Sequence, residues 1–237
     1  MNKIQLFCLP FAGGSSLAYY NWKPYLHPSI EIIPLELAGR GTRINDSFYP
    51  NLSAAVDDAY HLIKKKINGL PYVLFGHSMG AMIAYEVIQK LVNSNNQIPI
   101  HAFFSGCRAP HLADRKKKYH LLSESEFKAS ILELGGTSPE LFNSADFLDI
   151  FLPLLRNDFK IVETHDVQES IRPLPFPITV FLGKSDEFSA DQCDSWKKHT
   201  SGLCSIYHFN GGHFFHQEHM EQLIKLMNFR VAESLQY

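Results

Sequence analysis

The chain has 237 residues, of which 45% are hydrophobic and 19% charged, and its formal net charge at pH 7 is −2. The length suits one domain, or one domain with an insertion, and the apolar content excludes a largely disordered chain. The absence of excess lysine and arginine disfavours a nucleic-acid-binding protein, because binding to a phosphate backbone depends on basic side chains.

Cysteine usage and the N-terminal sequence predict a cytoplasmic protein. The four cysteines are far apart and form no C-x-x-C pair, which favours a reducing compartment; they are Cys8, Cys107, Cys193 and Cys204. The N-terminus lacks the apolar region and cleavage site of a signal peptide, and no run approaches the ~18 apolar residues of a membrane span. The 12 histidines are scattered without a metal-ligand spacing.

Short apolar runs alternate with longer helical patterns along the chain. The predicted strands are residues 4–9, 30–35, 72–75, 100–105, 178–182 and 205–209. The predicted helices are residues 53–67, 78–91, 123–134, 145–158, 190–199 and 214–235. Several of the strands are apolar on both faces, which is typical of strands buried between two layers of helices. The alternation predicts an α/β fold with a mostly parallel central sheet flanked by helices.

Residues from about 108 to 174 interrupt this alternation. They contain no convincing strand but include two of the helical patterns. The first pattern opens with the S-x-x-E of a capping box at 123–126, and it ends at Gly135-Gly136. The segment therefore reads as a helical insertion, either inert or a lid over a site, and we favour the lid.

A nucleophile motif follows the third predicted strand. Residues 76–80 read G-H-S-M-G, which fits G-x-S-x-G, and they lie directly between a strand and a helix. This is the strand–turn–helix context of a nucleophile elbow, in which Ser78 is the nucleophile. A glycine-rich helix start with a capping serine is the alternative.

A serine nucleophile needs a base and a group that orients the base. His213, after Gly211-Gly212, lies between the last strand and the last helix, and Asp186 follows the strand 178–182. The order Ser78, Asp186, His213 is that of α/β-hydrolases. Residues that could be mistaken for the base are His208, His216 and His219; Glu187 is the rival of Asp186, and a solvated loop position is the alternative for His213.

Acyl transfer also needs N–H donors for the oxyanion. The first expected donor is the backbone N–H of Met79, directly after the nucleophile. The second should come from the loop 10–14, P-F-A-G-G, which follows the first strand. We choose the N–H of Ala12 over that of Phe11; the alternative is a glycine-rich turn that only starts a helix.

Motifs along nearly the whole chain resemble the stand-alone type II thioesterases of nonribosomal-peptide and polyketide synthesis. They are LFCLPFAGGSS (6–16), ELAGRGTR (36–43), FGHSMGAMIAYE (75–86), FFSGCRAP (103–110), LPLLRNDFKIVE (152–163), FLGKSDEF (181–188) and FNGGHFF (209–215). The chain departs from the family pattern at Ala38, where a PGRG-like segment is expected, and at Cys107, where an arginine is expected.

The resemblance implies one α/β-hydrolase domain over residues 1–237 with a helical lid at about 108–174. It implies a Ser78–Asp186–His213 triad, with oxyanion donors at Ala12 and Met79. The implied activity is hydrolysis of acyl groups from the phosphopantetheine arm of carrier proteins, in antibiotic or siderophore biosynthesis, without a metal or other cofactor.

The expected partners are acyl or peptidyl carrier proteins, with no nucleic acid and no membrane, and the expected state is a monomer. Residues expected to contact substrate or carrier are Phe11, Arg40, Arg108 and Phe214. A basic run at 115–118 is a candidate for steering an acidic carrier, although a solvated charge run is the simpler interpretation. Phe142, Phe147 and Phe151 either line an acyl channel or belong to the core of the insertion.

Three other functions remain open from the sequence. A general esterase would use the same triad on oxyesters. An acyl-releasing or cyclising thioesterase is another alternative; in a cyclase an internal nucleophile replaces water. A non-catalytic carrier-binding module would retain these residues for packing alone.

Overall fold

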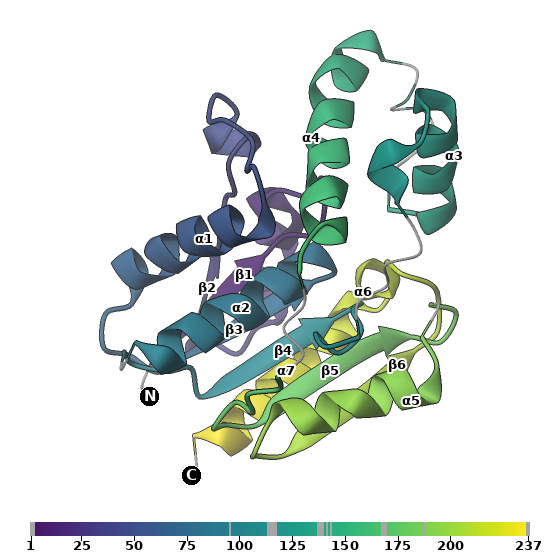
Figure 1. Cartoon of the computed structure of the whole chain (residues 1–237). Coiled ribbons are helices and arrows are strands. Elements are labelled where there is room, and N and C mark those ends of the chain that lie inside the picture. The colour runs from purple at the N-terminus through teal and green to yellow at the C-terminus, as the bar shows by residue number, and fades with distance from the viewer. Residues whose placement is uncertain are drawn as a thin grey trace.

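The computed structural model describes residues 3–94, 96–112, 118–136, 140, 142, 144–166, 170–186 and 188–235, with the backbone alone of residues 145–147. Its centre is a six-stranded sheet in the order β2-β1-β3-β4-β5-β6 (Figure 1). The strands are β1 (Ile4–Leu9), β2 (Ile30–Pro34), β3 (Tyr72–His77), β4 (His101–Ser105), β5 (Ile178–Gly183) and β6 (Cys204–Phe209). Every neighbouring pair is parallel, so all six carboxyl ends meet at one edge of the sheet.

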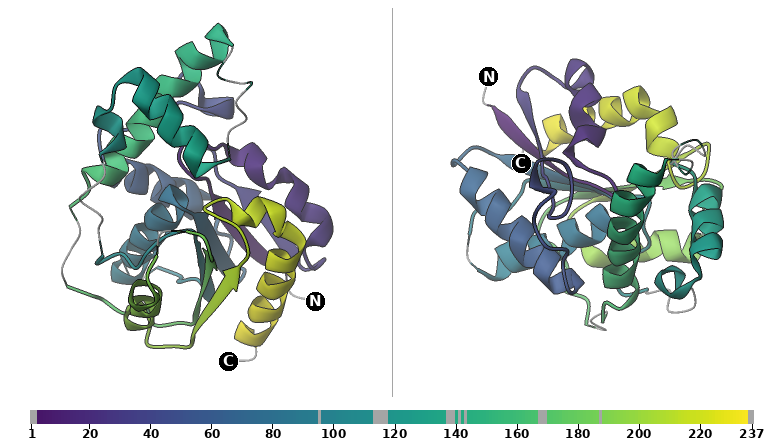
Figure 2. Two further views of the ribbon diagram at one scale, coloured as in Figure 1. Left: turned by 90° about the vertical axis from the view of Figure 1, so that its right-hand side faces the viewer. Right: turned by 90° about the horizontal axis from the view of Figure 1, so that it is seen from above.

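Helices cover both faces of the sheet. On one face lie α1 (Leu52–Lys66), α2 (Met79–Asn93), α5 (Ala190–Asp194) and the 3-10 helix η5 (Ser195–His199); on the other lie the 3-10 helix η1 (Ser16–Tyr25), α6 (Phe215–Glu218) and α7 (Met220–Ser234) (Figures 1 and 2). Alternate residues of β1 point to opposite faces: Phe7 and Leu9 join one apolar core, and Leu6 and Cys8 join the other. Burial on both faces explains why the strands read as continuous apolar runs.

The helical segment predicted between two strands lies between β4 and β5. It contains the 3-10 helix η3 (Tyr119–Leu121), α3 (Glu124–Leu134) and α4 (Ala145–Glu163), which stand above the carboxyl edge of the sheet (Figure 1). The predicted capping box is present, since Ser123 and Glu126 cap each other's backbone N–H groups. The helix α3 ends at Gly135, where φ is +78°.

Several elements of the structure differ from the predictions. The 3-10 helices η1 and η3 and the short 3-10 turn η2 (Gly41–Arg43) were not predicted. The helix α4 continues to Glu163, beyond the expected end at residue 158. The helix predicted at 190–199 changes to 3-10 geometry at Ser195, and the last helix is interrupted at His219, where φ is −113°.

Candidate active site

The turn between β3 and α2 holds Ser78 in a strained backbone conformation. Its φ of 54° and ψ of −118° make it the single non-glycine residue with positive φ among those the structure describes. Strain of this kind is concentrated at functional sites, and it is what a nucleophile elbow requires. The turn points the Ser78 side chain away from the sheet, at the N-terminus of α2.

The glycines of the motif are required by close backbone contacts. A β-carbon on Gly76 would lie 2.2 Å from the carbonyl oxygen of Gly80, and one on Gly80 would lie 2.2 Å from that of Leu9. Both distances are far below van der Waals contact, so neither position accepts a larger residue without moving backbone. The G-x-S-x-G pattern therefore reflects packing of the elbow against β1.

The structure brings the three predicted triad side chains together. His213 Nε2 lies 2.9 Å from Ser78 Oγ, and His213 Nδ1 lies 2.9 Å from Asp186 Oδ2. The imidazole bridges a hydroxyl and a carboxylate, which is the arrangement that lets a histidine take a serine proton while a carboxylate orients it. The side chains of His213 and Asp186 are 18% and 12% exposed, so the site is largely shielded from water.

The alternative bases are engaged elsewhere. His208 is exposed on β6. His216 is buried with its ring against that of His77, the two centroids 3.9 Å apart, and His219 Nε2 bonds to the carbonyl of Asn210. Glu187, the rival of Asp186, lies outside the described residues.

The residues that carry the two expected oxyanion donors line the pocket that contains Ser78. Met79 is the first residue of α2, where backbone N–H groups have no intrahelical acceptor. Within the described part of the chain, the N–H of Ala12 donates to no protein acceptor. Both residues line the same pocket as Ser78, so both N–H groups are unengaged donors near the nucleophile.

A cavity of about 700 Å³ opens above the triad. Its floor includes Ser78, Asp186 and His213, and its walls come from α3, α4 and the loop after β1. The apolar lining residues include Phe11, Ala12, Met79, Met82, Ala109, Leu112, Ile131, Leu134, Phe151, Leu155, Phe159, Val162, Phe188 and Phe214. An apolar wall beside a serine–histidine pair is suited to a reacting carbonyl that carries a hydrocarbon chain.

The chain matches the thioesterase domain family over residues 4–230. It belongs to the thioesterase family. It is 33% identical over 226 residues to the gramicidin S biosynthesis protein GrsT of Aneurinibacillus migulanus. The alignment covers 95% of this chain and 88% of that protein. The predicted family and enzyme class are thereby confirmed: the chain is a thioesterase.

Solved structures show the same fold. The crystal structure of ClbQ from the colibactin NRPS/PKS pathway superimposes with a TM-score of 0.92 at 35% identity, over 98% of each chain. YbtT, a type II thioesterase from the yersiniabactin NRPS/PKS pathway, gives a TM-score of 0.86 at 26% identity, over 98% of this chain and 94% of that one. These neighbours have the α/β-hydrolase fold, which confirms the fold prediction.

Three of the four residues expected to contact substrate line the pocket of this thioesterase. Phe11 and Phe214 pack edge to face with centroids 5.1 Å apart. Arg108 also lines it, with its guanidinium carbon 5.5 Å from the Phe188 ring centroid. These three side chains lie in the same pocket as Ser78.

Arg40 is different, and the prediction that it contacts substrate or carrier is corrected. Its side chain is 3% exposed and is paired with Asp158, so it presents no surface to a docking protein. Of the basic run at 115–118, residues 115–117 lie outside the described part of this thioesterase, and Lys118 is exposed.

Of the three phenylalanines singled out in the insertion, Phe142, Phe147 and Phe151, the structure describes the side chains of two. Phe151 lines the pocket and also packs against the small apolar cluster of the insertion. Phe142 packs against that cluster. The side chain of Phe147 lies outside the described part of the structure.

Two buried histidines surround the triad of this thioesterase without joining it. Burial and the neighbouring His213 lower the pKa of His216 to about 3, and burial is also the main cause of a strongly lowered pKa at His77. Both rings are therefore neutral near pH 7. These two neutral rings therefore place no positive charge beside the triad.

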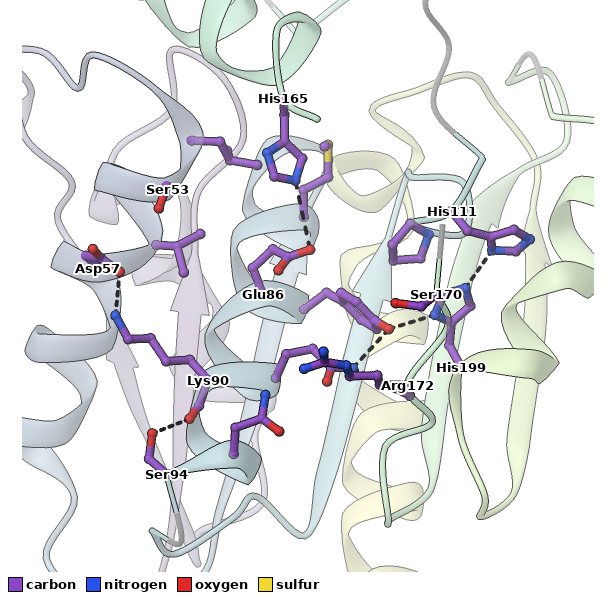
Figure 3. Close-up of a pocket in the computed structure, with 17 residues that line it drawn as sticks. Ser53, Asp57, Glu86, Lys90, Ser94, His111, His165, Ser170, Arg172 and His199 are labelled. Atoms are coloured by element: carbon purple, nitrogen blue, oxygen red, sulfur yellow. Dashed lines mark hydrogen bonds and ion pairs between the residues drawn. The ribbon is translucent and has the colours of Figure 1, made fainter. Parts of the chain in front are cut away.

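A second, smaller cavity of about 310 Å³ lies beside the first and shares Met82, Pro110 and His165 with it. Its walls are mainly polar (Figure 3). In it, Tyr85 Oη links His199 to Gln89, at 2.8 and 3.0 Å.

Among the described residues, no cluster of three or more His, Cys, Asp or Glu side chains is placed to hold a metal ion. Within the same part of the chain, no helix is both long enough and apolar enough to cross a membrane.

Proposed function

We propose that this thioesterase hydrolyses acyl groups from the phosphopantetheine arm of acyl or peptidyl carrier proteins in nonribosomal-peptide or polyketide synthesis. In this role it removes aberrant or stalled acyl units and so frees blocked synthases. The observation that carries the proposal is the position of His213, 2.9 Å from both Ser78 Oγ and Asp186 Oδ2, at the floor of an apolar cavity. The membership of GrsT, ClbQ and YbtT in such pathways supports the choice of substrate.

In the first half of the reaction, Ser78 Oγ attacks the thioester carbonyl while His213 Nε2 accepts its proton. Asp186 holds Nδ1–H and stabilises the imidazolium that forms. The N–H groups of Ala12 and Met79 receive the oxyanion, and each donor of this kind contributes about 3–4 kcal/mol to transition-state stabilisation. The thiol of the arm then leaves with the proton from His213.

In the second half, His213 takes a proton from water, which attacks the acyl–Ser78 ester. The same two N–H groups stabilise the second oxyanion. When this intermediate collapses, His213 returns its proton to Ser78 Oγ, so the acid is released and the Ser78 hydroxyl is restored. These steps use side chains and backbone of this chain alone, with no metal or other cofactor.

The helices α3 and α4 act in this proposal as a lid within a single α/β-hydrolase domain. Their apolar side chains, including Ile131 and Leu155, form the wall along which an acyl chain lies. The protein works as a monomer that docks carrier proteins one at a time.

The test compares one acyl group presented on a phosphopantetheinylated carrier protein and as a simple oxyester, with Ser78→Ala as the control. We expect a higher kcat/KM for the carrier-bound thioester, and loss of turnover in a folded Ser78→Ala protein. Preference for the oxyester would make the protein a general esterase. A cyclic product in place of the free acid would identify a cyclising enzyme, and turnover retained by Ser78→Ala would remove the triad assignment.

A further inference from the structure

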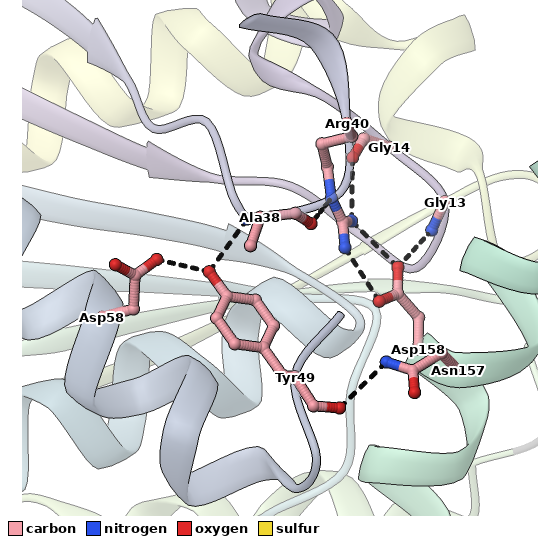
Figure 4. Close-up of polar contacts among 8 residues, drawn as sticks. All are labelled: Gly13, Gly14, Ala38, Arg40, Tyr49, Asp58, Asn157 and Asp158. Atoms are coloured by element: carbon pink, nitrogen blue, oxygen red, sulfur yellow. Dashed lines mark hydrogen bonds and ion pairs between the residues drawn. The ribbon is translucent and has the colours of Figure 1, made fainter. Parts of the chain in front are cut away.

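The helix α4 contributes a buried carboxylate to the loop that follows β1. Asp158 is fully buried, and its two oxygens accept a paired contact from Arg40: Nη2 donates to Oδ1 at 2.8 Å and Nη1 to Oδ2 at 2.9 Å (Figure 4). Oδ2 also accepts the backbone N–H of Gly13 at 2.8 Å. The carboxylate therefore joins α4 both to Arg40 and to the loop.

Arg40 holds the next residue of the same loop. Its Nη1 donates to the carbonyl of Gly14 at 3.1 Å, and its Nε donates to the carbonyl of Ala38 at 3.3 Å (Figure 4). The guanidinium is thus engaged on three sides in a dry environment, where such bonds are strong and directional. The loop is fixed at Gly13 from α4 and at Gly14 from Arg40.

These contacts reach the expected oxyanion donor through one peptide plane. Gly14 N–H donates to the carbonyl of Phe11 at 2.9 Å. The Phe11 carbonyl and the Ala12 N–H belong to the same trans peptide and point in opposite directions. Fixing Gly14 therefore fixes the direction of the Ala12 N–H, and the Gly13 N–H bond to Asp158 fixes the following peptide.

The helix also packs directly on this loop. Gly13 has φ of +73°, and a β-carbon there would lie 2.8 Å from Leu155 Cδ1 and 3.0 Å from the Phe151 ring. Both of those α4 side chains line the cavity above Ser78. The middle of α4 and the loop are thus joined by packing and by charge.

We propose that Arg40 and Asp158 are positioning residues for the oxyanion site, which hold the Phe11–Ala12 peptide so that the Ala12 N–H faces the reacting carbonyl. The inference rests on the proposed function, because it assigns a task to the loop only if Ala12 stabilises an oxyanion. Neither side chain touches substrate; both act through the backbone of residues 11–14. The ion pair also makes the donor's position depend on where α4 lies.

A neighbouring ion pair provides a matched control. Arg43 binds Asp58 and donates to the carbonyl of Glu36 at 3.1 Å, and neither side chain contacts the loop 10–14 in any hydrogen bond of the described residues. Arg43→Gln therefore removes the pairing of a nearby arginine with Asp58 and with Asp46 and leaves the loop anchored. The two pairs differ in burial, since the Arg43 and Asp58 side chains are each 26% exposed.

The experiment measures steady-state and burst-phase kinetics on an acyl thioester for Asp158→Asn, Arg40→Lys and Arg43→Gln. Asp158→Asn keeps the side-chain shape but loses the charge. Arg40→Lys keeps the charge but loses the planar guanidinium, which donates to both Asp158 and the Gly14 carbonyl. We expect kcat to fall about 10- to 100-fold in the first two variants, with KM changed less than about 3-fold, because the lost interaction acts in the transition state. The affinity for a trifluoromethyl ketone analogue of the substrate should fall in parallel with kcat/KM.

Fold integrity is checked by near-UV circular dichroism, and Arg40→Lys remains informative if Asp158→Asn fails to fold. Wild-type kcat in a folded Arg40→Lys or Asp158→Asn protein would overturn the inference. An equal loss in Arg43→Gln would also overturn it, by showing a general effect of losing an ion pair in this region. Failure of the proposed function has a different signature: the unchanged protein would not hydrolyse the thioester, or Ser78→Ala would still do so.

Discussion

At the scale of single residues, the elbow around Ser78 can form only because Gly76 and Gly80 have no β-carbon. The Gly80 Cα faces the carbonyl oxygens of Leu9 and Pro10, at 2.2 and 2.6 Å from where a β-carbon would stand. The nucleophile turn and the oxyanion loop therefore pack backbone against backbone. This contact sets the distance between the two expected oxyanion donors.

Replacing Gly80 with alanine should therefore damage both the fold and the reaction. We expect the free energy of unfolding to fall by about 3 kcal/mol or more, since backbone carbonyls cannot rotate away as a side chain would. The remaining folded protein should show a lower kcat, because the two donors are pushed apart. Urea unfolding and thioester kinetics measure the two effects.

Gly69→Ala is the matched control for this prediction. Gly69 has φ of +85°, and a β-carbon there would meet nothing within 4 Å, so the expected cost is the conformational strain of about 1–2 kcal/mol. Kinetics should be unchanged. Equal loss of stability in both variants would show that the contact with Leu9 is unimportant.

The sequence predicted the residues of the triad but not those that support the oxyanion loop. Ser78, Asp186 and His213 each follow a strand of a parallel sheet, so their meeting at one edge is expected from the strand pattern. Arg40 and Asp158 are 118 residues apart. Neither directly follows a predicted strand, so the strand pattern does not bring them together. Their partnership depends on how α4 lies over the sheet, which no local pattern specifies.

One departure from the expected family motif has a structural counterpart. The N–H of Ala38 donates to Tyr49 Oη at 2.9 Å, and Tyr49 in turn bonds to Asp58 (Figure 4). The proline expected at position 38 has no N–H to donate. Alanine thus permits a hydrogen bond that fixes this turn close to Arg40.

At the scale of elements, α4 contributes a row of apolar side chains to the wall of the pocket. Phe151, Leu155 and Phe159 recur every four residues and all line the cavity, which places them on one face of the helix. The same helix presents Asp158 to Arg40. One helix thus carries both the acyl-facing surface and the anchor of the oxyanion loop.

Shortening Leu155 should change which acyl chains are hydrolysed. Leu155→Ala lengthens the apolar cavity, and each further methylene that becomes buried adds about 0.8 kcal/mol of binding, a factor of about four in kcat/KM. We expect the kcat/KM ratio of decanoyl to hexanoyl thioesters to rise at least about 4-fold. Leu132→Ala, at a side chain 39% exposed on α3, is the control and should leave the ratio unchanged. A ratio unchanged in Leu155→Ala would place the acyl chain elsewhere.

The strands were predicted better than the helical ends, for a physical reason. Burial on both faces makes each strand a short apolar run with clear limits, whereas a helix end depends on caps and contacts. The break at His219 follows Phe215, whose buried ring stacks on that of Phe209 in the apolar core. The segment Ser16–Tyr25 contains Pro24 and forms 3-10 geometry, for which the apolar pattern gives no signal.

At the scale of the whole molecule, several histidine side chains are buried and uncharged in the folded protein. His101 lies between the sheet and α7, where its ring nitrogens bond to Thr179 Oγ1 at 2.8 Å and Ser234 Oγ at 2.9 Å. Burial, aided by the nearby Arg230, lowers the pKa of His101 to about 3. The pKa of His199 is likewise lowered, to about 4.

These groups predict loss of stability in mild acid. The unfolded chain binds a proton on each such histidine below the ordinary pKa of 6.5, whereas folded His101 does not until the pH nears 3. The unfolded state then holds more protons, so stability falls as the pH falls from about 6.5 toward 3. Each neutral histidine contributes a slope of about 1.4 kcal/mol per pH unit within that window.

His101→Gln tests one of these contributions. The variant should lose about 1.4 kcal/mol per pH unit from the slope of unfolding free energy between pH 5.5 and 4, although its stability at pH 7 also changes. Urea unfolding at a series of pH values gives the slope. A slope equal to that of the unchanged protein would show that His101 is protonated in the folded state.

The pair formed by Arg40 and Asp158 also restricts which segments between β4 and β5 can be exchanged among related proteins. Residues between β4 and β5 leave the sheet and return to it, so the segment resembles a cassette that recombination could replace to alter substrate choice. Asp158 lies within that segment, but its partners Gly13 and Arg40 lie near the N-terminus. An incoming segment without a carboxylate at position 158 would leave the buried guanidinium of Arg40 without its negatively charged partner. Functional hybrids should therefore arise when the donor and the recipient already share this acid and this arginine.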